Sequence, residues 1–114
     1  VAADAALLEQ ALGNLLDNAI DFTPENGTIV LSAHPQEDRV TIQVSDNGSG
    51  IPDFALPRIF ERFYSLPREN GQKSSGLGLA FVSEVARLHQ GDVTLCNRPE
   101  GGAQASFTLH RHFT

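Results

Sequence analysis

The segment from Arg39 to Ser45 alternates strictly between polar and apolar side chains. Because successive side chains of a β-strand point to opposite faces, this alternation predicts a strand with one face in a core and the other in water. Such a strand needs a second layer over its apolar face. The β-rich segment from Thr28 to His34 precedes it across a short turn at residues 35–38, so we expect the two to form a hairpin.

Two segments with helical periodicity can supply the covering layer. The first follows a capping residue, Asp4, and its apolar side chains recur at helical spacing as far as Phe22. The second covers residues 76–89, and residues 92–97 and 104–110 are expected to form two closing strands. This order predicts an α/β (α+β) sandwich of two layers, with helices packed on a mostly antiparallel sheet.

Composition limits the class of protein further. The 114 residues suit one domain, 1–114, with a single core. A net charge of −6 argues against binding to nucleic acid or to a membrane surface, and no apolar run approaches the ~18 residues of a membrane span. Cys96 has no second cysteine to pair with, which favours a reducing compartment. Because the sequence lacks Met, we expect it to be a piece of a longer protein.

The first helix carries a polar stripe beside its apolar one. Gln10, Asn14, Asp17, Asn18 and Asp21 share this face. A solvated surface explains Asp17 and Asp21, but asparagine is a poor helix former, and a solvated face more naturally uses Glu, Lys or Gln. The amide oxygens of Asn14 and Asn18 are therefore candidate ligands for a hard cation such as Mg²⁺, together with water and phosphate.

Asp46 continues the apolar side of the second strand, in phase with Val44. A carboxylate on a core face is costly unless it is hydrogen-bonded. Two explanations stay open: the strand has already ended and Asp46 opens an Asx turn, or Asp46 lies at the mouth of a pocket and accepts a hydrogen bond from a ligand. In the second case Gly48 and Gly50 would let the backbone approach that ligand closely.

A long irregular stretch, residues 47–75, separates the hairpin from the second helix, and such stretches in small domains are usually functional. Its basic residues lead into small residues at a helix start, where unpaired N–H groups bind anions. A solvated loop explains the charges, and a lid over phosphates explains both features. The basic residues are Arg58, Arg62, Arg68 and Lys73, and the small-residue segment is Ser74-Ser75-Gly76-Leu77-Gly78-Leu79.

Four segments together resemble the sequence boxes of bacterial sensor histidine kinases. Residues 14–19 resemble the N box, 46–52 the G1 box, 59–64 the F box and 76–80 the G2 box, in the family's order. The resemblance implies the Bergerat ATP-binding fold, a sandwich of helices on a mixed, mostly antiparallel sheet. It also implies ATP and Mg²⁺ as ligands, and transfer of the γ-phosphoryl group to a histidine on a separate dimerisation domain.

The resemblance implies roles at matching positions. Asn18 is expected to bind Mg²⁺, Asn14 to act at the phosphates, and Asp46 to accept the exocyclic amine of adenine. Arg68 and Lys73 are expected to join the two asparagines as catalytic residues by neutralising phosphate charge. The other residues expected around the nucleotide are Phe22, Gly48, Gly50, Ile51, Phe60, Tyr64, Ser75, Gly76, Leu77, Gly78 and Leu79. Phe60 and Phe63 are expected to anchor the lid, or else simply to fill the core.

Departures from the family pattern leave alternatives. Many relatives have Lys at Asp21 and Arg at Ser65, and losing these contacts puts tight ATP binding in doubt; a Thr often found on the last strand falls at about Ala105 or Ser106. A non-catalytic docking module of the same fold is therefore one alternative. An ATP hydrolase of the gyrase type is another, but it uses Glu where this chain has Asn14, a poor general base.

The expected partners lie elsewhere in a parent kinase. No histidine of this chain is followed by the acidic residue that typically follows the family's acceptor histidine. We therefore expect the domain to bind nucleotide without phosphorylating itself, and to act on its own dimerisation domain and, through it, on a response regulator. The parent is expected to be membrane-anchored, with this domain at the cytoplasmic face of the inner membrane and touching neither the membrane nor nucleic acid.

Overall fold

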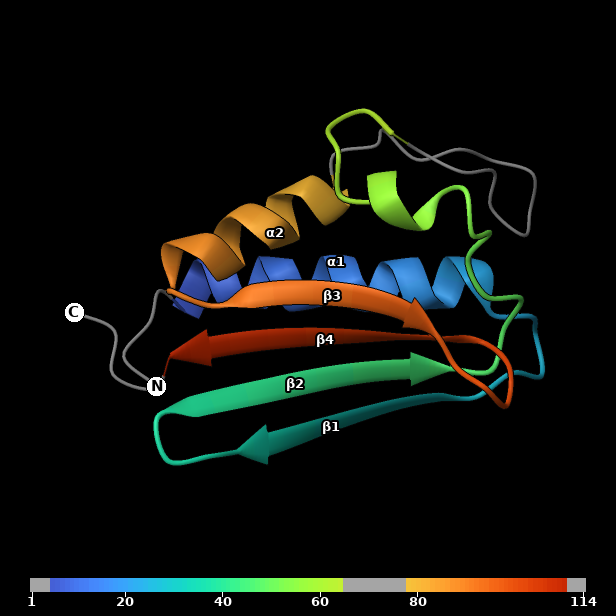
Figure 1. The fold of residues 1–114 in the computed structure, drawn as a ribbon. Helices are drawn as coiled ribbons and strands as arrows, with labels where there is room; N and C mark the ends of the chain where they lie inside the picture. Colours follow the sequence, from blue (N-terminus) through green and yellow to red (C-terminus); the bar gives the residue numbers. More distant parts are fainter. Residues whose placement is uncertain (1–4, 65–77, 111–114) are drawn as a thin grey trace.

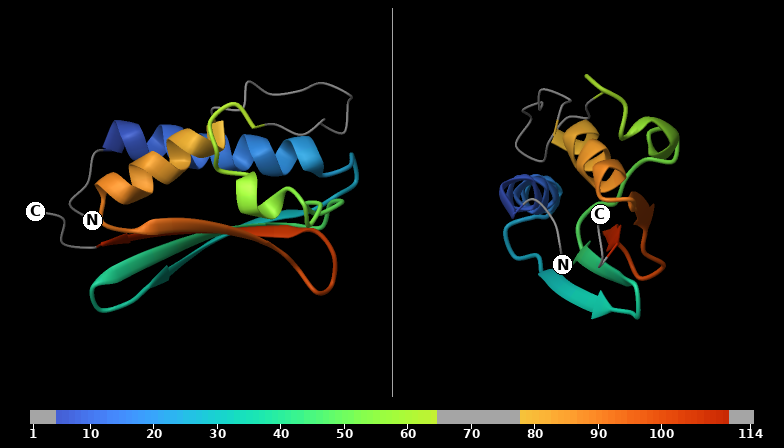
Figure 2. Two further views of the ribbon diagram at one scale, coloured as in Figure 1. Left: turned by 45° about the horizontal axis from the view of Figure 1, so that its top comes forward. Right: turned by 90° about the vertical axis from the view of Figure 1, so that its left-hand side faces the viewer.

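The computed structural model describes residues 5–64 and 78–110. Two helices, α1 (Ala5–Phe22) and α2 (Gly78–Leu88), cover one face of a four-stranded sheet (Figures 1 and 2). The strands are β1 (Ile29–Pro35), β2 (Arg39–Asp46), β3 (Asp92–Asn97) and β4 (Ala103–His110), and a short 3-10 helix, η1 (Leu56–Arg58), lies between β2 and α2. The predicted two-layer α/β fold is confirmed. No helix within the described ranges is long and apolar enough to cross a membrane.

The strands lie in the order β1-β2-β4-β3, and each neighbouring pair is antiparallel. The expected mixed character of the sheet is therefore not found among the described strands. The physical reason is the position of β4. The connection through α2 brings β3 back in the same direction as β2, but β4 is inserted between them (Figure 1). No parallel ladder can form, because β2 and β3 are not neighbours.

The main core lies between the helices and the inner face of the sheet. The fully buried side chains include Val82 and Val85 of α2, and Phe107 and Leu109 of β4. The apolar stripe of α1 faces them, and its buried members recur at helical spacing as Ala11, Leu15, Ala19 and Phe22. The structure thus confirms the periodicity read from the sequence, and it leaves the polar stripe of α1 outside this core.

The outer face of the sheet is polar, as the alternation of β2 predicted. Across β2 and β4, three rungs of facing side chains are hydrogen-bonded: Thr41 to Thr108 at 3.1 Å, Gln43 to Ser106 at 3.4 Å, and Ser45 to Gln104 at 3.3 Å. The inner positions Val40, Ile42 and Val44 face β4 residues Leu109, Phe107 and Ala105. The register is therefore fixed from both faces, since a one-residue slip would exchange these two sets of side chains.

A second, smaller core holds the irregular segment against the end of the sheet. Ile51, Ala55 and Ile59 are buried with Ala103 of β4. The only helix in this described segment is η1, which is short and has a proline near its start. Phe63 adopts a left-handed conformation, with φ of 67°, which ends any helical continuation. This small core fixes the backbone that follows β2, next to the candidate site.

Candidate functional site

The candidate site lies at one end of the sandwich. The C-terminal ends of α1, β2 and β3 lie at this end, and the N-terminal end of α2 lies nearer the middle of α1 (Figure 1). Asn14 and Asn18 are both partly buried on α1. The side-chain amide of Asn14 donates a hydrogen bond of 3.2 Å to the carbonyl oxygen of Gly78, 64 positions later. The predicted N box and G2 box are thus brought together by the fold.

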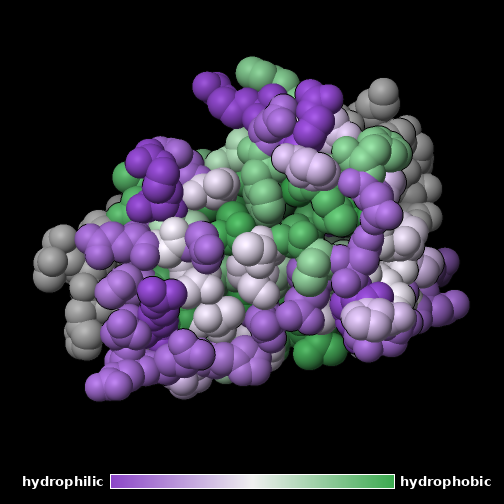
Figure 3. Space-filling view, viewed as in Figure 1, coloured by the Kyte–Doolittle hydropathy of each residue, from purple (hydrophilic) through white to green (hydrophobic). Residues whose placement is uncertain are grey.

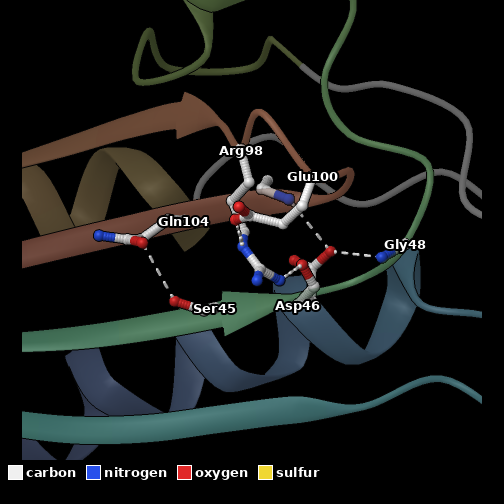
Figure 4. Close-up of polar contacts among 7 residues, drawn as sticks. Ser45, Asp46, Gly48, Arg98, Glu100 and Gln104 are labelled. Carbon is white, nitrogen blue, oxygen red and sulfur yellow. Dashed lines mark hydrogen bonds and ion pairs between the residues drawn. The ribbon is translucent and has the colours of Figure 1, made fainter.

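Asp46 is the last residue of β2, and only 5% of its surface is exposed. Its Oδ1 accepts hydrogen bonds from the backbone N–H of Gly48 at 2.9 Å and of Ala103 at 3.3 Å (Figure 4). The Asx-type turn of the first explanation is therefore present, although β2 extends to Asp46 instead of ending before it. The contact with a ligand in the second explanation stays a prediction. The two donors offset the cost of burying Oδ1. In the described part of the chain no hydrogen bond reaches Oδ2.

The turn after β2 packs against the end of α1. A Cβ atom at Gly48 would lie 2.1 Å from the carbonyl oxygen of Phe22, so only glycine allows this approach. The same carbonyl accepts the backbone N–H of Ser49 at 3.4 Å. On the other side of the turn, the Asn47 side chain accepts the backbone N–H of Thr28 at 2.8 Å. Phe22, which is buried, is therefore held beside Gly48.

Gly50 and Ile51 continue this turn onto β3. Gly50 has a φ of 78°, and a Cβ atom there would lie 2.9 Å from Oδ1 of Asn97. The Asn97 side chain both accepts from the N–H and donates to the C=O of Ile51, each at 2.7 Å. Sequence reasoning missed Asn97, because a polar residue that ends a strand looks unremarkable and its partner lies 46 positions away.

The F-box residues are placed differently from one another. Phe60 is partly buried against the small core, whereas Phe63 is 67% exposed, so the core-filling alternative is wrong for Phe63. The guanidinium groups of Arg58 and Arg62 lie over the rings of Tyr64, at 4.7 Å, and Phe63, at 5.4 Å. Half of the basic residues predicted for phosphate thus contact aromatic rings in this structure.

Phe60 also lines a hollow of about 590 Å³ between the F-box segment and α2. The space-filling view shows hydrophobic side chains gathered on this side of the molecule, below the segment that carries η1 (Figure 3). The residues that line the hollow are Phe60, Arg62, Ala80, Phe81, Ser83 and Glu84. None of the N-box or G1-box candidates is among them, so this hollow is separate from the site around Asp46.

The other residues singled out in the sequence are partly buried, exposed, or outside the described residues. Leu79 is partly buried and packs against both cores. Asp17 is exposed, as a solvated face requires, while Asp21 is only partly exposed. Five of the expected site residues, Arg68, Lys73, Ser75, Gly76 and Leu77, lie outside the described residues, as does Ser65.

Ala105 and Ser106, where the family's last-strand Thr is expected to fall, lie on opposite faces of β4. Ser106 points to the outer face of the sheet, where its hydroxyl accepts a hydrogen bond from Gln43, and Ala105 faces Val44, two residues before Asp46 on β2. The residue of β4 that contacts Asp46 is Ala103, through its backbone N–H.

Comparison with known proteins places this chain in a family. Residues 3–112 match the family model described as "Histidine kinase-, DNA gyrase B-, and HSP90-like ATPase", and the chain belongs to this family. It is 75% identical over 114 residues to the sensor protein CreC of Escherichia coli (strain K12), matching the whole of this chain and 24% of that protein. It is 41% identical over 110 residues to the adaptive-response sensory kinase SasA of Nostoc sp., matching 96% of this chain and 27% of that protein.

Solved structures agree with these sequence relationships. The mycobacterial sensor histidine kinase MprB superimposes with a TM-score of 0.86 at 28% identity, over 96% of this chain and 76% of that one. Full-length ShkA, solved in complex with AMPPNP, superimposes with a TM-score of 0.75 at 36% identity, over 90% of this chain and 21% of that one. The chain spans about a quarter of the length of the curated relatives it matches.

Proposed function

We propose that residues 1–114 form the ATP-binding catalytic domain of a longer sensor histidine kinase, which binds MgATP and gives the γ-phosphoryl group to a histidine on a separate dimerisation domain. The observation that carries the proposal is Asp46, a buried carboxylate with Oδ1 held by two backbone N–H groups. The identity with CreC, a sensor protein, supports the assignment to a sensor kinase. ShkA, a structural relative, was solved with an ATP analogue.

Asp46 fits the recognition of adenine. With Oδ1 occupied, Oδ2 is the oxygen left to accept a hydrogen bond, and the exocyclic amine of adenine is a donor. Guanine carries a carbonyl oxygen at the equivalent ring position, which a carboxylate repels. A buried acceptor also penalises a ligand that leaves it unpaired. We therefore expect the site to select ATP over GTP.

Asn14 and Asn18 are the groups proposed for phosphate and Mg²⁺. The described residues contain no group of three or more His, Cys, Asp or Glu side chains that could hold a metal ion. This suits Mg²⁺ bound mainly by phosphate oxygens and water, with an amide oxygen of Asn18 added, because Mg²⁺ keeps much of its hydration. Bound there, Mg²⁺ would neutralise phosphate charge. The Nδ2 of Asn14 donates to the carbonyl oxygen of Gly78, which holds this amide beside the start of α2.

Phosphoryl transfer depends chiefly on positioning and charge neutralisation. We assign the neutralising charges to Arg68 and Lys73, and contacts with the nucleotide to Ser75, Gly76, Leu77 and Gly78. The acceptor histidine, the response regulator and the membrane anchor belong to the parent protein. The site includes no carboxylate at the Asn14 position, which favours a kinase over a hydrolase, because an amide cannot act as the general base for water.

Calorimetric titration of a non-hydrolysable ATP analogue into the domain, with and without Mg²⁺, tests the proposal. We expect saturable binding that strengthens with Mg²⁺, and phosphorylation of an added dimerisation domain when ATP replaces the analogue. Absence of binding at millimolar nucleotide would overturn the proposal in favour of a docking module. Steady release of phosphate without an acceptor domain would instead identify a hydrolase.

A further inference from the structure

The β3–β4 turn lies directly against the backbone of Asp46 (Figure 4). Gly101 and Gly102 have φ values of 108° and 86°, and a Cβ atom at Gly102 would lie 2.0 Å from the Asp46 carbonyl oxygen. The backbone N–H of Arg98 closes the turn on the carbonyl of Gly102 at 2.9 Å. The shape of this turn is therefore adapted to contact the end of β2.

Arg98 completes the hydrogen bonding of β2 where the ladder runs out. The last paired rung between β2 and β4 is Ser45 with Gln104, so β4 supplies no ladder partner to the next residue, Asp46. Nη1 of Arg98 donates to the Asp46 carbonyl oxygen at 2.7 Å. The guanidinium is itself held by Glu100, with Nε 2.8 Å from Oε1. Because a buried carbonyl needs a partner, Arg98 fixes the backbone that carries the Asp46 carboxylate.

Asn97 acts in the same way on the other side of the turn that follows β2. Its side-chain amide pairs with both backbone groups of Ile51, in the manner of one more strand residue. Ile51 is 4% exposed and belongs to the small core. The backbone from Asp46 to Ile51 is thus tied at both ends to two consecutive residues, Asn97 and Arg98.

We propose that Arg98 and Asn97 are positioning residues of the nucleotide site, which hold Asp46 and the turn after it in the geometry that recognises adenine. This inference rests on the proposed function, since it assigns a purpose to the base site. Neither side chain contacts the base in this account. Both act through the backbone, so that Oδ2 of Asp46 is already oriented before nucleotide arrives, and the cost of ordering it on binding is avoided.

Two substitutions test the inference with little change in shape. Arg98→Met keeps the apolar stem of the side chain and removes its donors. Asn97→Asp keeps the acceptor to Ile51 and removes the donor. Arg87→Met is the matched control, because Arg87 is exposed on α2 and pairs only with Glu84 among the described residues. Arg98→Lys retains one donor for the Asp46 carbonyl and should therefore keep most of the wild-type preference for ATP. If Arg98→Met does not fold, Asn97→Asp tests the inference by itself.

The measured quantity is the ratio of the dissociation constants for GTP and ATP. It is obtained for each variant by displacement of a fluorescent ATP analogue, at a temperature below the melting temperature of that variant. A misplaced Asp46 weakens the binding of ATP but not that of GTP, because GTP binding does not use the carboxylate. We expect the affinity for ATP to fall roughly tenfold in each test variant, and the ratio of dissociation constants to fall by the same factor. We expect neither quantity to change in Arg87→Met. A role confined to folding would lower both affinities by one common factor and leave the ratio unchanged.

The two possible failures are distinguishable. If the wild-type domain shows no preference for ATP over GTP, the proposed function fails, and the positioning role fails with it. If the wild type prefers ATP and both test variants keep that preference, the positioning role is overturned while the proposed function stands.

Discussion

The carboxylate of Asp46 accepts a hydrogen bond of 3.3 Å from the backbone N–H of Ala103, 57 positions later in the chain. This contact joins the end of β2 to the start of β4. It ties the orientation of the candidate base-binding group to the pairing of the two central strands. The site is therefore a property of the assembled sheet and not of the G1 segment alone.

Replacing Asp46 with Asn should weaken ATP and ADP to a similar extent, because both nucleotides carry the same base. The Asn oxygen can still accept from Gly48 and Ala103, so the fold should persist. The amide would then present N–H donors to the adenine amine, an unfavourable pairing that we expect to cost about 1–3 kcal/mol. Calorimetry with both nucleotides measures this, and circular dichroism checks the fold. A loss confined to ATP would contradict the assignment of Asp46 to the base.

Replacing Asn18 with Ala should abolish the strengthening of ATP binding by Mg²⁺ and leave the fold intact. Asn18 lies on the partly buried polar face of α1, and alanine is the better helix former. The comparison is between titrations with Mg²⁺ and with a chelator, and Asp17→Ala serves as control because Asp17 is exposed on the same helix. An unchanged response to Mg²⁺ would remove Asn18 from the metal site.

Alanine at Gly48 and alanine at Gly78 should have opposite effects on stability. At Gly48 the added methyl would lie 2.1 Å from the Phe22 carbonyl oxygen, so the turn must shift at a cost of about 1–3 kcal/mol. At Gly78 the nearest atoms, in Asn14, are 3.9 Å away. The helix propensity of alanine should then raise stability by up to about 1 kcal/mol. Thermal denaturation decides, and equal melting temperatures for the two variants would argue against this packing of the turn on α1.

Phe107→Ala should be among the most destabilising single changes. Phe107 is fully buried in the main core, and deleting its ring should cost about 3–5 kcal/mol. Ser106→Ala is the matched control on the outer face of the same strand, where only a hydrogen bond of 3.4 Å from Gln43 is lost, and we expect a cost below about 1 kcal/mol. Urea denaturation measures both changes. A similar cost for the two substitutions would mean that the faces of β4 are assigned wrongly.

The helices and strands of this fold could be predicted from the sequence because each produces a pattern among neighbouring residues. The alternation from Arg39 to Ser45 marked β2, and helical spacing marked α1 as far as Phe22, where the structure ends it. Asp46 could also be identified from the local pattern, because its carboxylate is in phase with the core face of β2. In each case a periodic pattern of burial is imposed on neighbouring residues, so a short window of sequence is sufficient to show it.

The residues that hold the candidate site together could not be predicted in this way. Asn97 and Arg98 carry no pattern of their own, and their partners Ile51 and Asp46 are brought beside them only when β4 pairs with both β2 and β3. The contact between Asp46 and Ala103 depends on the fold in the same way, since the N–H of Ala103 reaches Asp46 only when β4 pairs with β2.

The sequence by itself determined the two layers, the identity of the polar groups and the position of Asp46 at a strand end. The tertiary structure decided the antiparallel order of the strands and which oxygen of Asp46 is occupied. It also decided which residues fix the turn after β2. The physical reason is that periodicity reports which side of an element is buried, whereas a hydrogen bond between distant residues depends on strand register and turn geometry, which are settled only when the whole sheet packs.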